Sequence, residues 1–160
     1  MQFFPGPIRT SAPGDAVRLE NAVDLREMFS VDIRSGIESG RQGKAVRVTT
    51  PPGMEMLATA VPMRGHTLDI PAWVEVKARA LKGVGGFAVY PKGSSEPLTE
   101  PAGLPVNGKT EVLWIALRSL KGADLFVVRN GFSESRSVVE VEDLALWVRH
   151  EDFEKYEEQL

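Results

Sequence analysis

The chain has 160 residues, of which 42% are hydrophobic and 26% charged, and this is the size and composition of one ordinary globular domain. Its formal net charge is -3, with acidic and basic residues interspersed, so it lacks the basic stripe that nucleic acid requires and the polybasic cluster that an anionic membrane attracts. It contains no cysteine, which excludes disulfides and a thiolate nucleophile.

Residues 1–15 are rich in Pro, Gly, Ser and Thr, and this composition predicts an extended N-terminal arm that Phe3 and Phe4 could pin to a surface. The arm has neither the basic start nor the apolar run of a signal peptide, so a cytoplasmic location is the default expectation. The stretch 16–36 that follows fits a strand with a short helical or irregular excursion.

From Gly43 onward, short β-rich runs alternate with clusters of Gly, Pro, Asn and Asp. The predicted strands are residues 44–50, 56–62, 71–81, 86–93, 110–120, 123–131 and 136–148. This spacing predicts an all-β fold, an antiparallel two-sheet β-sandwich (jelly roll) over residues 16–149. The "GVGG" of residues 83–86 joins two of the strands and is predicted to be a hairpin turn. Residues 150–160 are predicted to form an acidic helical tail, solvated, or a linker.

No catalytic pattern stands out. The chain has no nucleophile elbow, and its two histidines, His66 and His150, have no partner at metal-ligand spacing. "GVGG" lies between two strands, whereas a phosphate-binding loop must open a helix. We therefore expect a protein that is not an enzyme.

The alternation of residues within two strands separates a core face from an outer face. In residues 71–81 the outer face consists of Trp73, Glu75, Lys77 and Arg79. In residues 110–120 it consists of Val112, Trp114, Ala116 and Arg118.

The last strand, "RSVVEVEDLALWVRH", changes parity halfway. Its first apolar residues, Val139 and Val141, and its later ones, Leu144 onward, fall on opposite sides if the strand is regular. A β-bulge at Glu142 and Asp143 would insert one residue and restore a single core face. Trp147 then lies on the outer face, with Ala145 and Arg149.

All three tryptophans are thus expected off the core, although a large apolar ring favours burial. Two explanations are open: the tryptophan rings are covered by the N-terminal arm or by another subunit, or they contact a ligand. Flat aromatic rings suit the C–H faces of sugars, and neighbouring polar side chains can bond to hydroxyls.

The order "GKAVRVTTPPG", "TLDIPAWVEVKARALKG", "FAVYPKG", "LWIALRSLKGADLFVVRNG" and "SVVEVEDLALW" resembles the jelly-roll domains of the carbohydrate-binding module class and their galactose-binding-like relatives. The resemblance covers about residues 36–149. It implies an accessory domain that binds a glycan, and a structural calcium ion at the acidic pair of the last strand, here Glu142 and Asp143. The first acid is Glu in this chain, and the N-terminal stretch "RLENAVDL" matches poorly the segment that usually supplies the other ligands.

Two functions follow from these observations. The first is a non-catalytic glycan-binding module, and its candidate ligand-binding residues are Trp73, Glu75, Arg79, Trp114, Arg118, Asn130, Trp147 and Arg149. The second is a structural or assembly domain that uses the same aromatic face for protein–protein contact, consistent with the enrichment of Trp and Arg at interfaces. The resemblance favours the first, and the absence of a secretion signal favours the second.

Overall fold

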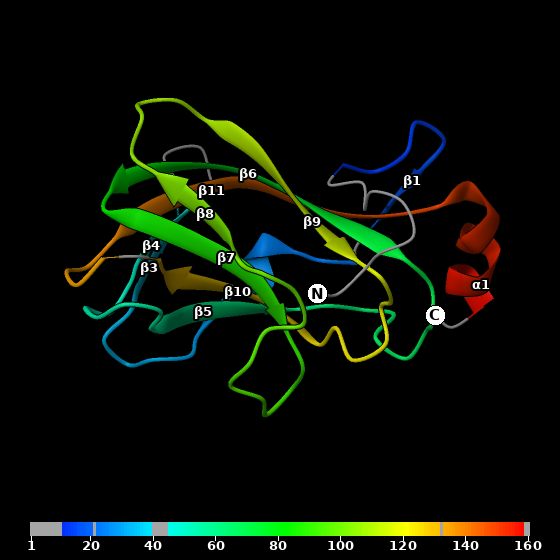
Figure 1. Cartoon of the computed structure of the whole chain (residues 1–160), viewed down its shortest axis with the longest axis horizontal. Coiled ribbons are helices and arrows are strands. Elements are labelled where there is room, and N and C mark those ends of the chain that lie inside the picture. The colour runs from blue at the N-terminus through cyan, green and yellow to red at the C-terminus, as the bar shows by residue number, and fades with distance from the viewer. Residues whose placement is uncertain (1–10, 21, 40–44, 132, 159–160) are drawn as a thin grey trace, which may run out of the picture.

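The computed structural model describes residues 11–20, 22–39, 45–131 and 133–158. Its strands form two antiparallel sheets packed face to face, and a short C-terminal helix lies at one end of the sandwich (Figure 1). This confirms the predicted all-β sandwich with a short helix at the C-terminus. None of the helices in the described part of the chain is long and apolar enough to span a membrane.

The first sheet has six strands. Its order is β3 (Gly36–Ser39), β4 (Val46–Thr49), β11 (Val138–Val148), β6 (Ala72–Lys82) and β9 (Glu111–Leu117), and β1 (Val17–Leu19) also pairs with β11. The second sheet has the order β2 (Phe29–Ser30), β5 (Leu57–Pro62), β10 (Leu125–Asn130), β7 (Val84–Tyr90) and β8 (Ala102–Pro105). The remaining elements are the 3-10 helices η1 (Leu25–Glu27) and η2 (His150–Asp152) and the α-helix α1 (Phe153–Glu158).

All seven predicted strands are present, as β4, β5, β6, β7, β9, β10 and β11. The ambiguous stretch 16–36 contains β1, then η1, then β2, so the predicted excursion from a strand is confirmed. Strands β3 and β8 were not predicted. Each has four residues and lies at the edge of its sheet, and a short half-exposed strand has little periodicity to read.

The core lies between the inner faces of the two sheets. Phe87 of β7 and Phe126 of β10 stack across neighbouring strands with ring centroids 5.9 Å apart. The valines and alanines of β6 at alternate positions, Val74 to Ala80, are buried against them. Burying such side chains contributes about 1.5–3 kcal/mol each, so this two-sided contact is the main source of stability.

The predicted bulge in β11 is present. Val141 pairs with Ala78 and Asp143 pairs with Lys77, so Glu142 is the extra residue. The apolar residues on both sides of Glu142 are therefore buried, although they have opposite parity in the sequence. The parity change predicted this irregularity correctly.

The "GVGG" segment is not a hairpin turn. Strands β6 and β7 belong to different sheets and do not pair, so the chain crosses from one sheet to the other at Gly83. Gly83 has φ +70°, and a Cβ atom there would lie 2.4 Å from the Ser137 hydroxyl oxygen. A glycine between two strands indicates a sharp turn but does not distinguish a hairpin from a crossing.

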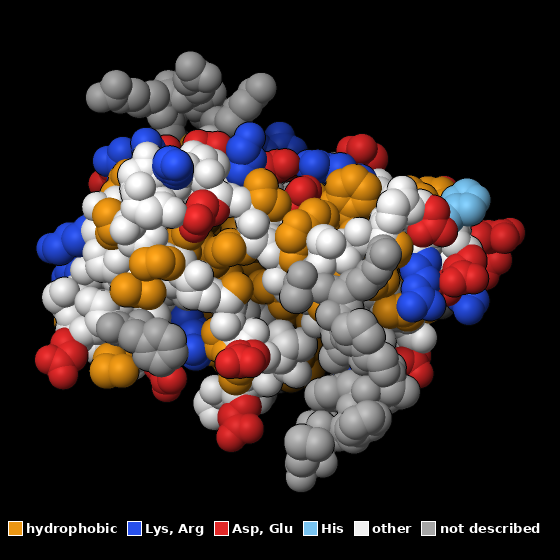
Figure 2. Space-filling model, turned by 45° about the horizontal axis from the view of Figure 1, so that its top comes forward, with side chains coloured by type: hydrophobic (Ala, Val, Ile, Leu, Met, Phe, Trp, Pro, Cys, Tyr) orange, Lys and Arg blue, Asp and Glu red, His pale blue; other side chains and the backbone are white. Residues whose placement is uncertain are grey.

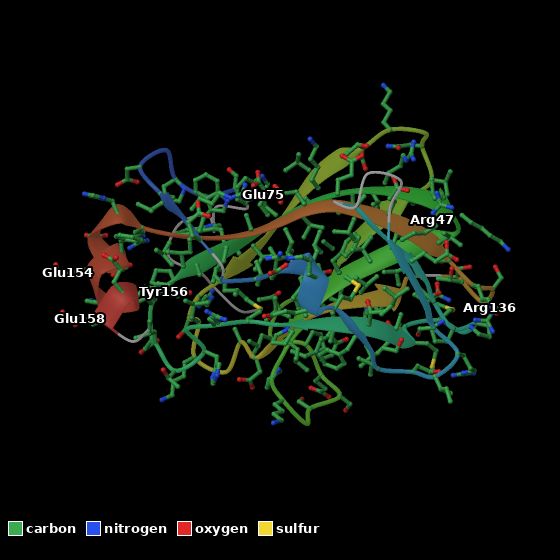
Figure 3. All side chains as sticks on the ribbon, turned by 180° about the vertical axis from the view of Figure 1, so that it is seen from behind. Arg47, Glu75, Arg136, Glu154, Tyr156 and Glu158 are labelled. Carbon is green, nitrogen blue, oxygen red and sulfur yellow. The ribbon has the colours of Figure 1, made fainter. Side chains whose placement is uncertain are left out.

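The C-terminal tail was predicted to be solvated, and this is wrong for one face of α1. Tyr156 is buried and Phe153 packs against the core, whereas Glu154 and Glu158 are exposed and lie on the outer side of the helix (Figure 3). The acidic composition concealed two aromatic residues three positions apart, which lie on one side of a helix.

The crossing at Gly83 gives a stability prediction. Gly83→Ala should lower the free energy of unfolding by about 2–4 kcal/mol, because alanine is strained at positive φ and its Cβ overlaps Ser137. Gly108→Ala is the control: Gly108 has φ +76°, but a Cβ atom there would have no heavy atom within 4 Å, so only about 1–2 kcal/mol should be lost. Equal losses in urea denaturation would contradict the proposed overlap.

Candidate functional site

The outer face of the six-stranded sheet, here called the tryptophan face, brings together several residues predicted from the sequence. Trp73 on β6 pairs with Trp147 on β11, and Glu75 pairs with Trp114 on β9. The rings of Trp114 and Trp147 have centroids 6.3 Å apart and are tilted by 57°. Strands β6 and β11 pair antiparallel, which brings these tryptophans onto one face.

The three tryptophans nevertheless do not form an open platform. Trp73 lies on the outer face but is only 6% exposed, so in this structure it offers little surface for stacking. Trp114 and Trp147 are half-buried. The indole Nε1 of Trp147 donates to Glu75 Oε1 at 3.3 Å, which holds that ring against the sheet.

The charged side chains of the tryptophan face pair with one another. Arg47 and Arg79 both bond to the carboxylate of Glu140, at 3.3 and 3.2 Å. Lys77 lies 3.9 Å from Glu142. Figure 2, in which the top of Figure 1 comes forward, shows hydrophobic side chains bordered by charges of both signs. Arg79, predicted as a ligand contact, is thus paired with Glu140 through Nη2, while its Nε is buried without a hydrogen-bond partner in the described part of the chain.

The other predicted contacts do not join this surface as expected. Asn130 is fully buried, and its amide donates to the carbonyls of Pro51 and Ser135, so its assignment as a ligand contact is wrong. The parity of β10 places it on the inner side. Arg149 is exposed and lies 3.7 Å from Glu151, and Arg118 is exposed just beyond the end of β9.

The acidic pair proposed for calcium diverges at the bulge. Asp143 accepts two hydrogen bonds from Arg18, at 3.1 and 3.2 Å, and Arg18 also lies 3.9 Å from Glu75. Glu142 turns the other way and accepts from the Thr110 hydroxyl at 3.0 Å. Within the described ranges, no three Asp, Glu, His or Cys side chains are grouped as a metal site. The guanidinium group of Arg18 thus lies beside Asp143 and neutralises its carboxylate, and the calcium site stays a prediction.

The outer face of the five-stranded sheet is different. Its floor is a row of small or apolar residues across four strands, because Phe29, Ala60, Val127 and Ala88 are successive partners in the register. A groove of about 310 Å³, here called the Arg129 groove, lies on this face. It is lined by Val31, Asp32, Glu55, Met56, Leu57, Tyr90, Ser95 and Arg129.

Arg129 is the buried cation among the residues that line this groove. It is 9% exposed, and its Nη1 donates to the Tyr90 hydroxyl at 3.2 Å. Its Nε is buried and has no hydrogen-bond partner in the described part of the chain. Gly86 makes room for it, because a Cβ there would lie 3.1 Å from the Arg129 Cγ. A buried charge with an unused hydrogen-bond donor lowers the stability of the folded protein unless another group accepts that hydrogen bond.

Glu55 stands beside this arginine in an unusual backbone conformation. Its φ of 64° makes it the one non-glycine residue with positive φ among those described. Its carboxylate is 4.0 Å from Arg129 Nη2, and its side chain is 60% exposed. Backbone strain of this kind often marks a functional loop.

The rim of the groove combines apolar residues with one fixed carboxylate. Val31, which lines the groove, is 46% exposed. Outside the lining, Phe29 and Met54, each close to a lining residue in the sequence, are 44% and 51% exposed. The Arg34 side chain, hydrogen-bonded to Asp32, lowers the pKa of that carboxyl to about 2, so Asp32 is ionised and a fixed acceptor at neutral pH. Apolar surface beside oriented polar groups is the usual composition of a ligand site.

Sequence reasoning missed this groove. In "LFVVRN" both parities are mostly apolar, so the outward position of Arg129 could not be separated from the core positions beside it. One signal was available: an arginine at alternate spacing with Leu125 and Val127, in a strand buried on both faces, indicates a charge that needs a partner.

No protein-family model matches the chain, and no curated protein matches it in sequence. Solved structures are similar in fold. A family 29 carbohydrate-binding module from Piromyces equi, CBM29_1, is 9% identical with a TM-score of 0.55, covering 86% of this chain and 89% of that one. A second family 29 module is 8% identical with a TM-score of 0.53, covering 88% and 84%.

A third similar structure is a CBM29-2 mutant complexed with mannohexaose, which is 9% identical with a TM-score of 0.51 over 91% of each chain. These likenesses confirm the resemblance in architecture: the chain has the two-sheet sandwich fold of carbohydrate-binding modules.

The strain at Glu55 gives a prediction. Glu55→Gly should raise the free energy of unfolding by about 0.5–1 kcal/mol, because glycine adopts positive φ without a steric penalty. Glu55→Ala also removes the carboxylate but keeps the strain, so it should give no gain. Urea denaturation measures both, and equal values would contradict a strained backbone.

The Arg18–Asp143 contact gives a second prediction. The melting temperature should be the same in calcium and in EDTA, because Arg18 already neutralises Asp143. Asp143→Asn should cost at most about 1 kcal/mol, since both side chains are more than a third exposed. A higher melting temperature in calcium that Asp143→Asn abolishes would instead restore the calcium site.

Proposed function

We propose that this chain is a non-catalytic module that binds a glycan in the Arg129 groove. The sandwich fold that it shares with carbohydrate-binding modules, one of them complexed with mannohexaose, supports the class of ligand. The observation that carries the proposal is Arg129, a buried cation whose Nε lacks a partner among the described residues and which lines an open groove.

The groove offers the two kinds of contact that a sugar needs. Next to the groove, the exposed ring of Phe29, on the same face as Ala60 and two residues before the groove-lining Val31, provides a flat apolar surface for the C–H face of a pyranose. Arg129 provides donors, and the ionised Asp32 provides acceptors, for hydroxyl groups. Individual contacts of this kind are offset by desolvation and ordering, so we expect dissociation constants in the order of micromolar to millimolar.

The tryptophan face is less suited to a glycan. A sugar there would have to displace the Trp147–Glu75 hydrogen bond and the ion pairs of Glu140 with Arg47 and Arg79. Displacing bonds that are already made gives little net gain.

A second candidate function is assembly through the tryptophan face. Val112 is 49% exposed beside the half-buried Trp114 and Trp147, and their neighbouring charges are internally paired. A half-buried aromatic pair beside exposed aliphatic surface suits a protein interface.

Glycan binding is tested first by screening the full chain on a glycan array and then by calorimetric titration of the best oligosaccharide. Phe29→Ala should weaken binding roughly fivefold to tenfold through loss of ring contact, and Arg129→Met should weaken it about tenfold or more. Trp114→Ala, on the opposite sheet, is the matched control and should leave the affinity unchanged.

The possible outcomes separate the two surfaces. Loss of binding in Trp114→Ala but not in Phe29→Ala would move the glycan site to the tryptophan face. No binding to any glycan, together with a concentration-dependent dimer that Trp114→Ala dissociates, would replace the glycan proposal with assembly. Far-UV circular dichroism of each variant identifies those that fail to fold.

A further inference from the structure

We infer that the ligand of the Arg129 groove carries a carboxylate, so that its glycan is an acidic one containing a hexuronate. This inference rests on the proposed function and specifies its substrate class. The structural reason is that Arg129 is a desolvated positive charge without a close counter-ion among the described residues.

Two carboxylates, those of Asp32 and Glu55, line the groove with Arg129, but neither is in hydrogen-bonding contact with this arginine. Its contacts are the neutral Tyr90 hydroxyl at 3.2 Å and the Glu55 carboxylate at 4.0 Å. At 4.0 Å the latter is too long for a hydrogen bond. Buried cations in proteins are normally paired with a carboxylate in direct contact. The neighbouring acid, Asp32, is already bonded by Arg34 at 3.1 and 2.9 Å.

The geometry of the guanidinium group favours a carboxylate over a hydroxyl. Nη1 is used by Tyr90; of the two donors on the remaining edge, Nη2 lies 4.0 Å from Glu55, and Nε is covered by the protein and has no partner among the described residues. That edge carries two parallel N–H donors at the spacing of the two oxygens of a carboxylate. A hydroxyl group satisfies one of these donors and supplies no charge, whereas a carboxylate satisfies both and neutralises the arginine.

The arginine is also held in place before any ligand arrives. Gly86 lies under its side chain and Tyr90 bonds its far end, so the guanidinium group is oriented over the floor of the groove. The guanidinium group is therefore preorganised, which favours affinity, although the atoms that cover Nε must move aside before a carboxylate reaches both donors. Glu55, exposed and at the rim, is able to swing away as the ligand enters.

The test compares each acidic oligosaccharide with its own neutral form. Oligomers of galacturonate, glucuronate and mannuronate are titrated into the full chain alongside their fully methyl-esterified forms, which keep the ring and lose the charge. We expect at least one acidic oligomer to bind about tenfold or more tightly than its ester, and to weaken as salt is raised.

Three variants assign the effect to Arg129. Arg129→Lys keeps the charge but loses the paired donors, and should reduce acid binding about tenfold while leaving ester binding little changed. Arg79→Lys, in a paired arginine on the opposite sheet, is the control and should change neither. Glu55→Gln keeps the exposed side chain, folds as the parent does, and should raise affinity for the acid alone by removing a competing carboxylate.

Each result decides between the two proposals. Equal binding of acid and ester would overturn the uronate inference and leave glycan binding intact. If the chain prefers the acid and neither Arg129→Lys nor Glu55→Gln changes that preference, the ligand carboxylate binds elsewhere. This result would also overturn the uronate inference. If neither these oligomers nor any neutral glycan binds, the proposed function itself fails.

Discussion

The central strand β11 holds the six-stranded sheet together. It can do so because one of its residues, Glu142, forms a β-bulge and has no partner in β6. Its first half pairs with β4 and its second half with β1, while β6 follows it along the whole length. The change of partner occurs around Glu142, the bulged residue. Without the extra residue, Leu144, Leu146 and Val148 would face solvent, and the sandwich would lose a large part of its core.

The sequence was sufficient for the architecture wherever one face of a strand is apolar and the other polar. Strand β6 alternates cleanly, and its two faces were separated correctly. The same reasoning found the bulge, because a strand whose apolar residues change parity can keep them all on the core face only if one residue is inserted. It failed at Gly83, where the local signal for a turn is the same whether the next strand joins the same sheet or the opposite one.

The candidate site was less predictable, for two physical reasons. Parity gives the side of a sheet on which a residue lies but not what covers it, so Trp73 was placed on the correct face and yet is buried. Charge pairing across strands depends on register, so the engagement of Arg79 by Glu140 could not be anticipated from either strand alone. Conversely, a strand apolar on both faces, such as β10, hides the outward direction of its one arginine.

Charge compensation separates the two outer faces of the sandwich more clearly than aromatic content does. On the tryptophan face, Glu140 forms ion pairs with two arginines and Asp143 forms one with a third, so the charges offset one another. A polar ligand there would have to replace these ion pairs with its own contacts and would gain little binding free energy. In the Arg129 groove the arrangement is reversed, because the floor is small and apolar and the paired carboxylate of Glu55 lies 4.0 Å from the cation. In the described part of the chain, each face has an arginine with a buried, unused Nε, but only Arg79 has a carboxylate in direct contact, and a buried cation without one is unfavourable for folding. The buried position of Arg129 is consistent with a binding partner that the described chain does not supply. A ligand that brings both oxygen acceptors and negative charge compensates this arginine most completely.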